Sequence, residues 1–266
     1  MNRTTQKQDN MKISKTIIMA VATLMIAGVT TTACKNQRSD NTSEATTLAE
    51  RQHQRSDKTS EATTLAERQN QRSDKTIEAS CTGTIDHSTW KPDASTSVEF
   101  SAFPKTINQW KQMQETLGTE PQGAAALQVM AFELYRNNRT DGEEALRLNN
   151  TATNYNSTVE RLREIMGNDQ FYARPYIAWA LLNGATPENG YSVEPPYSIN
   201  MKVDPNKKYQ ESQFLKGTVI YLLIDSKGWD TNWRGVEVVK PEGSKYFVVS
   251  NCPALYTQCK EAKTTK

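Results

Sequence analysis

The stretch Gln122–Asn137, QGAAALQVMAFELYRN, decides the fold expected for this chain. Glu120-Pro121 just before it is typical of a helix start, because proline is favoured in the first turn. The stretch is apolar around almost its whole circumference, and such a helix is normally central and buried. Glu133 interrupts the apolar run. A buried carboxylate needs a partner, so we expect an ion pair with a nearby arginine rather than a catalytic role.

Further helices are expected on both sides of this central helix. Apolar residues recur at helical spacing after Pro104, and Gly118 closes that helix. Beyond the central helix, Asp141-Gly142 predicts a turn before a short helix, and Ser157 is expected to cap another. An apolar helix then ends at Asn183-Gly184, a C-cap signal. The expected helices therefore cover residues 104–117, 122–137, 143–148, 157–166 and 175–182.

The other segments indicate β-structure. Leu215–Asp225 is the strongest predicted strand, and Pro241-Glu242-Gly243 is typical of a hairpin turn. Residues 81–103 predict a strand or an extended arm, and further strands are expected at 197–203, 234–240 and 245–250. The fold class is therefore α+β. In the domain at 81–266, a mainly helical half (81–183) packs on a small antiparallel β-sheet or partial barrel (184–262).

Composition separates this domain from the chain before it. All five tryptophans, ten tyrosines and six phenylalanines follow residue 81, so a core can form only there. Gln37-Arg38-Ser39-Asp40 recurs from Gln54 and from Gln71, a period of 17 residues. Each unit carries a single large aliphatic residue, Leu48 or Leu65, which is too few for a packed solenoid. Residues 34–80 are therefore expected to be a disordered tether with a span of about 35–40 Å.

The N-terminus has the features of an export signal. A basic segment from Met11 precedes an apolar run, Thr16–Val29, which is short for a membrane span but typical of a signal peptide. Thr31-Thr32-Ala33-Cys34 resembles the processing site of bacterial lipoproteins, with threonine where leucine is usual. The resemblance implies that residues 1–33 form a signal peptide, with Met11 as the expected translation start, and that it is cleaved after Ala33. It also implies acyl chains on Cys34 that hold the protein on a bilayer. A plain secretory peptide with an ordinary Cys34 is the alternative.

Several separated motifs resemble one bacterial family whose domain has no established function. They are Pro121–Ala126 (PQGAAA) running into Ala131–Tyr135 (AFELY), and Gly184–Tyr191 (GATPENGY) followed by Pro195-Pro196-Tyr197. Phe103-Pro104 with Trp110, and a late strand pair with Arg234, fit the same pattern. The likeness covers about residues 100–255. It implies a secreted or lipid-anchored bacterial protein and brings no activity or ligand.

Charge and residue usage argue against several kinds of chemistry. The net charge of +2 gives no field that would steer nucleic acid, so no such partner is expected. Two histidines, His53 and His87, and cysteines without Cys-x-x-Cys spacing argue against a zinc site. Asp86-His87-Ser88 are adjacent and cannot form a catalytic triad. We expect no catalytic residue, metal or cofactor, since glycine-rich phosphate loops and nucleophile elbows are also missing from the sequence.

Two segments are candidates for ligand binding. The first lies at the junction of the two halves, where clefts commonly form, and offers Glu188, Asn189, Tyr191 and Tyr197. The alternative for that segment is a structural turn set by Pro187 and Gly190. The second offers exposed aromatic and basic side chains beside a strand connection, Trp229, Trp233 and Arg234. These can stack on sugars or peptides, or can instead close the end of the sheet.

Export also favours disulfide formation. A bond between Cys252 and Cys259 would close a short loop and add about 2.5 kcal/mol in the chain-entropy model. Cys81 is an alternative partner for either one, and the sequence does not choose between these pairings.

Two functions follow from these observations. The first is a lipid-anchored protein of the cell envelope, most simply of a Gram-negative outer membrane, whose domain binds a protein or a glycan, or acts in assembly, without chemistry. The second is an envelope hydrolase that uses carboxylates such as Glu133 or Glu188 in a cleft at the helix–sheet junction.

Overall fold

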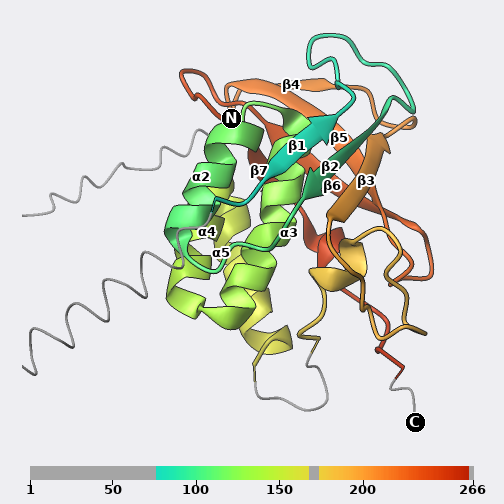
Figure 1. Cartoon of the computed structure of the whole chain (residues 1–266). Helices are drawn as coiled ribbons and strands as arrows, with labels where there is room; N and C mark the ends of the chain where they lie inside the picture. Colours follow the sequence, from blue (N-terminus) through green and yellow to red (C-terminus); the bar gives the residue numbers. More distant parts are fainter. Residues whose placement is uncertain (1–75, 168–173, 264–266) are drawn as a thin grey trace, which may run out of the picture. The chain divides into compact units, whose positions relative to one another are not determined.

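The computed structural model describes residues 76–167 and 174–263. The expected signal peptide, Cys34 and the repeats lie outside these residues and stay predictions. The described part is an α+β domain in which four helices pack against a curled antiparallel half-barrel sheet (Figure 1). The fold class predicted from the sequence is confirmed.

The helices lie together on one side of the sheet (Figure 1). They are α2 (Ile107–Leu117), α3 (Pro121–Asn137), α4 (Arg139–Asn149) and α5 (Ala152–Ile165). Every residue of α3 from Pro121 to Tyr135 is buried, as the apolar circumference of this stretch predicts. Within α3, Glu133 is only 2% exposed and pairs with Arg136, so the expected ion pair is confirmed.

The sheet has seven strands, in the order β1-β2-β3-β5-β6-β7, with β4 beside β5. The strands are β1 (Ala79–Thr82), β2 (Ser95–Phe100), β3 (Tyr197–Val203), β4 (Gln210–Ser212), β5 (Gly217–Asp225), β6 (Trp233–Val239) and β7 (Val248–Asn251). Strand β2 pairs with β3 from Ser95↔Lys202 to Phe100↔Tyr197. The sheet therefore joins segments from both ends of the domain, and it begins at Ala79, two residues before the expected boundary.

Side chains alternate between the two faces of the sheet, as period-2 patterning requires. Every second residue of the central strands is buried, for example Ile220, Leu222 and Ile224 in β5. Val98 of β2 lies opposite Ile199 of β3 in the same buried layer. The helices therefore cover one face of the sheet, and the other face carries the polar and partly exposed side chains.

The turn expected at Asp141-Gly142 is wrong. Both residues lie within α4, which begins earlier because the side chain of Asn138 caps it by accepting from the Asp141 N–H. A Cβ built on Gly142 would lie 2.1 Å from Tyr135 Cα of α3. Glycine serves here for close approach of two helices rather than for a turn.

The helix start expected at Ser157 is also wrong. Helix α5 begins at Ala152, and Thr151 caps it by accepting from the Asn154 N–H. Ser157 lies inside the helix and donates its hydroxyl hydrogen to Thr153 O at 2.9 Å. Short polar residues are favoured at caps, but here two candidates stand six residues apart and the sequence does not rank them.

The helix expected at 175–182 is replaced by turns and a short 3₁₀ helix, Trp179–Leu181. Its backbone follows mainly i→i+3 bonds, such as Leu182 N–H to Trp179 O at 3.0 Å. Asn183 N–H then pairs with Ser198 O of β3. The ring of Trp179 also packs against the rings of Phe103 and Tyr197. Tertiary contacts of this kind outweigh local helix propensity in so short a segment.

Candidate functional site

The segment Gly184–Tyr191 folds as a closed turn. Asn189 Oδ1 accepts from the Thr186 N–H at 2.9 Å, and Asn189 Nδ2 donates to Gly184 O at 3.0 Å. Glu188 is exposed and pairs with Lys263 at 2.8 Å. Asn189 therefore uses its side chain on its own backbone, and Glu188 points to a surface lysine. This geometry favours the structural-turn alternative for these two residues.

Tyr191, from the same segment, is only 1% exposed and has a positive φ of 61°. Its hydroxyl donates to Lys260 O at 2.9 Å, and its ring stacks on Tyr176 with centroids 5.0 Å apart. Burial, followed by the nearby Cys259, raises the pKa of Tyr191 far above its ordinary value. The phenol is therefore a neutral, fixed group rather than an acid or base.

Tyr197, at the start of β3, lies in a second aromatic cluster. Its ring contacts Phe100 at 5.4 Å, Phe103 at 5.6 Å and Trp179 at 5.4 Å between centroids. Tyr197 and Tyr191 are thus in different clusters. Trp179 packs against Tyr197, and Tyr176 packs against Tyr191. These contacts fix the positions of the two half-buried rings that come from the 3₁₀ segment and the turn before it.

An open cleft of about 310 Å³ lies beside these rings. Its walls combine aromatic side chains, a guanidinium and the end of the turn: Arg136, Pro175, Tyr176, Trp179, Gly190, Tyr191 and Ser192. We call this the aromatic cleft. It lies where the C-terminal end of α3 reaches the junction of the helical and β halves. Of the four residues considered for a cleft at this junction, only Tyr191 lines it.

Arg136 is held in place by Glu133. Its Nε donates to Glu133 Oε2 at 2.9 Å, and its Nη2 donates to Glu133 Oε1. Asn137 Nδ2 donates to the same Oε1 at 2.9 Å. This hydrogen bonding raises the pKa of Arg136 above its ordinary value. The pair carries no net charge, and neither bond uses Nη1, so Arg136 is a fixed hydrogen-bond donor rather than an isolated cation.

The second expected binding segment is divided by the structure. Trp229 is 3% exposed, and its Nε1 donates to Thr257 O. Arg234 donates from Nε to Ala254 O at 2.8 Å and lies over the Trp229 ring at 5.0 Å. Trp233 is 39% exposed and faces Lys202, whose Nζ lies 4.6 Å from its ring. Trp229 and Arg234 therefore close the end of the sheet, and Trp233 alone presents an exposed ring.

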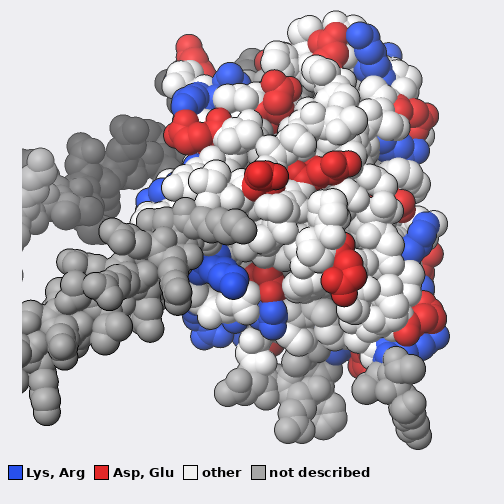
Figure 2. All heavy atoms as spheres, in the orientation of Figure 1, with Lys and Arg blue, Asp and Glu red and all other residues white. Residues whose placement is uncertain are grey.

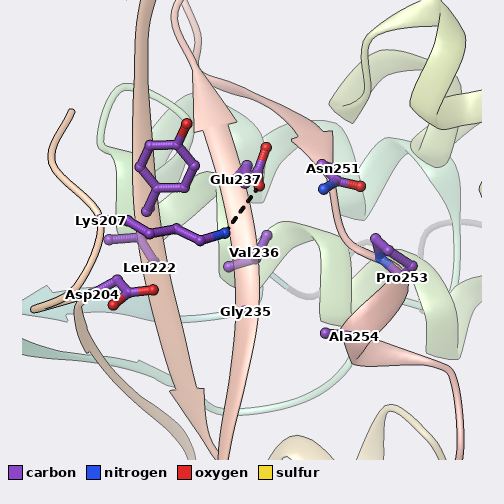
Figure 3. A pocket seen from close by; sticks show the side chains of 10 residues that line it. Asp204, Lys207, Leu222, Gly235, Val236, Glu237, Asn251, Pro253 and Ala254 are labelled. Carbon is purple, nitrogen blue, oxygen red and sulfur yellow. Dashed lines mark ion pairs between the residues drawn. The ribbon is translucent and has the colours of Figure 1, made fainter. Parts of the chain in front are cut away.

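A smaller pocket of about 130 Å³ lies over β5 and β6 on the face of the sheet away from the helices. Figure 3 shows Lys207 reaching across β5 towards Glu237 of β6, and Nζ lies 3.6 Å from the Glu237 carboxylate. The Lys207 ammonium also lies 4.9 Å from the Tyr221 ring. Asp204 and Gly235 line the same space. We call this the Lys207 pocket.

Among the described residues Cys81, Cys252 and Cys259 are free thiols, so none of the pairings that the sequence left open is present in this structure. Cys252 and Cys259 lie in different surroundings, which explains why they do not meet. Cys252 Sγ accepts from Asn154 Nδ2 at 3.4 Å and from Gln128 Nε2 at 3.6 Å, whereas Cys259 Sγ lies 3.9 Å from the Tyr191 hydroxyl. Burial raises the pKa of both thiols to about 11, so neither is a ready nucleophile.

The remaining charged groups of the described domain do not converge on a reaction centre. Glu143 pairs with Arg163 and Glu144 with Lys111, so these adjacent carboxylates point apart. His87 packs on the Phe247 ring at 5.6 Å. Within the described ranges, the His, Cys, Asp and Glu side chains form no group of three or more suited to a metal ion. On the face seen in Figure 2, acidic and basic groups form separate small clusters between wide neutral areas.

Sequence reasoning missed three residues of the aromatic cleft, Arg136, Tyr176 and Trp179. The spacing of Glu133 and Arg136, three residues apart on one helix, was a usable signal for the ion pair. Tyr176 and Trp179 lay in the expected apolar helix, where every large residue is a core candidate. Their half-buried positions depend on the turn that replaces that helix.

No helix in the part of the chain that the structure describes is both long and apolar enough to cross a membrane. No curated protein and no solved structure matches the chain. A family model described as a domain of unknown function matches residues 102–263, close to the extent of the resemblance noted in the sequence. These residues include the aromatic cleft and the Lys207 pocket, and they cover more than half of the chain. The chain therefore belongs to the DUF6935 family, a domain of unknown function.

Proposed function

We propose that this protein is a lipid-anchored cell-envelope protein whose α+β domain binds a glycan in the aromatic cleft, without catalysing a reaction. The observation that carries the proposal is the meeting of Tyr176, Trp179 and the Arg136 guanidinium around one open space of about 310 Å³. That volume lies at the lower end of the range typical of small-ligand sites.

The chemistry of the walls supports a neutral sugar over a charged ligand. Aromatic faces stack on the apolar faces of sugar rings, and fixed donors bind hydroxyl groups. Because Glu133 neutralises Arg136, the cleft has no net charge from this pair to favour an anion. The rings are rigid, since Trp179 packs on Phe103 and Tyr197, and rigid walls lower the entropic cost of binding.

The envelope address rests on the N-terminal sequence. The apolar run before Cys34 and the small residues leading to it support export, lipid attachment and retention at a membrane. The tether that we expect between Cys34 and the domain would let the cleft reach about 35–40 Å from the bilayer. A peptide or protein partner is the other occupant that this placement allows.

The hydrolase alternative has less support. Glu133 is engaged by Arg136 and Asn137, and Glu188 by Lys263. In the Lys207 pocket two carboxylates do line one space, Asp204 and Glu237, but about 130 Å³ holds only a few heavy atoms. A glycosidase needs room between its two carboxylates for a sugar ring.

A binding experiment tests the cleft. The purified full chain is titrated with soluble neutral oligosaccharides, including N-acetylated ones, and with acidic ones of equal length, while tryptophan fluorescence is recorded. We expect saturable binding of a neutral member and a loss of about tenfold or more in Trp179→Ala, by analogy with aromatic anchors elsewhere.

Trp233→Ala is the matched control, because Trp233 is also an accessible ring but lies outside the cleft. Equal losses in both variants, or tighter binding of the acidic sugars, would contradict the proposal. Metabolic labelling with palmitate, compared between the wild type and Cys34→Ser, tests the anchor separately. An unlabelled wild type would remove the envelope tether without affecting the cleft.

A further inference from the structure

We propose that the Lys207 pocket is a second binding site, which takes a primary ammonium group on a short alkyl chain. The inference is independent of the aromatic cleft, because the two sites share no lining residue. It starts from a carboxylate that the fold buries without a cation.

Asp204, directly after β3, is 9% exposed and lines the pocket. Its Oδ1 accepts from the Asn206 N–H at 2.8 Å, and within the described residues its carboxylate takes part in no ion pair. Figure 3 shows this carboxyl group turned towards β5, inside the pocket. Burying a charge costs free energy unless a partner compensates it, so this group favours a cation beside it.

The other charged groups of the pocket do not provide a cation partner for Asp204. Lys207 reaches over the pocket but pairs with Glu237, at 3.6 Å, and rests against the Tyr221 ring. One ammonium and two carboxylates therefore line the space, which gives a net charge of about −1 when all three are ionised. An anion would be repelled by this balance, and a cation would be attracted by it.

Gly235 of β6 provides the room. A Cβ built on it would meet nothing within 4 Å, and its backbone is not in the left-handed region, so neither space nor conformation requires glycine there. Glycine within a strand weakens it, and such a residue often marks a place where a ligand approaches the backbone. The volume of about 130 Å³ is about four times the share of one water molecule in the liquid, or four to five heavy atoms.

The pocket walls also fit an alkyl chain. Pro253 and Ala254, from a second 3₁₀ helix at Pro253–Leu255, face the strand residues across the pocket (Figure 3). Tyr221 also lines this space. A ligand whose ammonium group pairs with Asp204 and whose chain of about four carbons lies along these apolar surfaces would fill the pocket volume of about 130 Å³. A lysine side chain of a partner and a free alkylamine share this chemistry.

The probe is n-butylammonium, with n-butanol as the uncharged molecule of the same length. Binding to the purified full chain is followed by saturation-transfer NMR in a phosphate buffer of low ionic strength without amine components, since salt screens partly exposed charges. We expect saturable binding of n-butylammonium and none of n-butanol. Binding of both to the same extent would overturn the ammonium assignment.

Three variants are expected to change the affinity for n-butylammonium in predictable directions. Asp204→Asn keeps the acceptor for Asn206 and removes the charge, so we expect binding to weaken about tenfold or more. Lys207→Gln removes the competing ammonium, so binding should tighten. Gly235→Val fills the pocket and should abolish binding, and its fold is checked by circular dichroism.

Asp230→Asn is the matched control, because it makes the same charge change at a side chain that is 97% exposed and outside the pocket. An equal loss in Asp204→Asn and Asp230→Asn would show a general charge effect and refute the site. The absence of saturable binding in both the wild type and Lys207→Gln would do the same. A lysine-containing tripeptide and its norleucine counterpart then distinguish a partner side chain from a free amine.

Discussion

Replacing Gly142 with alanine should destabilise the domain, against the general preference for alanine in helices. On helix propensity alone the change would add about 1 kcal/mol of stability. In this structure the new Cβ would lie 2.1 Å from Tyr135 Cα and 2.4 Å from Tyr135 N. Ordinary contact begins at about 3.4 Å, so α3 and α4 would have to separate by more than 1 Å. The clash involves backbone, which a change of rotamer cannot relieve.

The magnitude follows from the cost of overpacking, typically about 1–3 kcal/mol and occasionally more. Because the clash is with backbone atoms, we expect a cost at the upper end of this range, about 2–3 kcal/mol. After the propensity gain of about 1 kcal/mol is subtracted, the net loss in the free energy of unfolding is about 1–2 kcal/mol. Separation of the two helices would also open space beside Leu134 and Leu146, which are fully buried, and so adds to the loss.

The assay is urea unfolding followed by far-ultraviolet circular dichroism, with the slope of the transition compared between variants. Gly235→Ala is the matched control, because its Cβ would meet nothing within 4 Å. That change should be neutral or stabilise by up to about 1 kcal/mol. If Gly142→Ala were as stable as the wild type, the close approach of α3 and α4 would be wrong.

Three further predictions concern single side chains. Thr151→Ala should lower the free energy of unfolding by about 1 kcal/mol through loss of the α5 cap, whereas Ser157→Ala should change it by less than about 0.5 kcal/mol; urea unfolding separates the two, and the reverse order would restore the rejected helix start. Glu133→Gln should cost about 1–3 kcal/mol in the same assay because it removes a buried, hydrogen-bonded charge, and Glu164→Gln, at an exposed ion pair, should cost less than about 1 kcal/mol. For Cys252, burial raises the pKa from 9.0 to about 11, so the thiol ionises first in the unfolded chain. Its contribution to stability should be complete below pH 9.0 and fall by about 1.4 kcal/mol per pH unit as the pH rises towards 11. Comparison with Cys252→Ala at several pH values measures this, and a constant difference would contradict it.

Patterns that act over short distances were sufficient for much of the fold. The apolar circumference of α3 predicted a central buried helix. The run of β-branched, aromatic and leucine residues within Leu215–Asp225 predicted β5, which spans Gly217–Asp225. A fully buried helix, or a strand with alternate residues buried, requires apolar residues at regular positions, so its burial can be recognised from the pattern of apolar residues in the sequence.

The wrong secondary-structure predictions fall where tertiary packing outweighs local helix propensity, or where a glycine can serve either for a turn or for close packing. Gly142 predicted a turn but serves for the packing of α4 on α3. Residues 175–182 predicted a helix, but packing of Trp179 against Phe103 and Tyr197 favours turns and a short 3₁₀ helix. The sequence left the pairing of Cys252 and Cys259 open, and in the structure one lies in a polar cluster of α3 and α5 and the other beside Tyr191.

The sequence by itself determined the α+β class, the buried central helix, and the expectation of an exported, lipid-anchored chain with a repetitive tether. The tertiary structure alone decided which side chains share a cleft. Arg136 and Trp179 meet although 43 positions separate them, and Asp204 faces Gly235 and Pro253 across two strands. The meeting of Asp204 with Gly235 arises from the pairing of β3 with β5 and of β5 with β6, which join segments far apart in the sequence. The free energy of these long-range contacts is spread over many residues, so no local pattern records it.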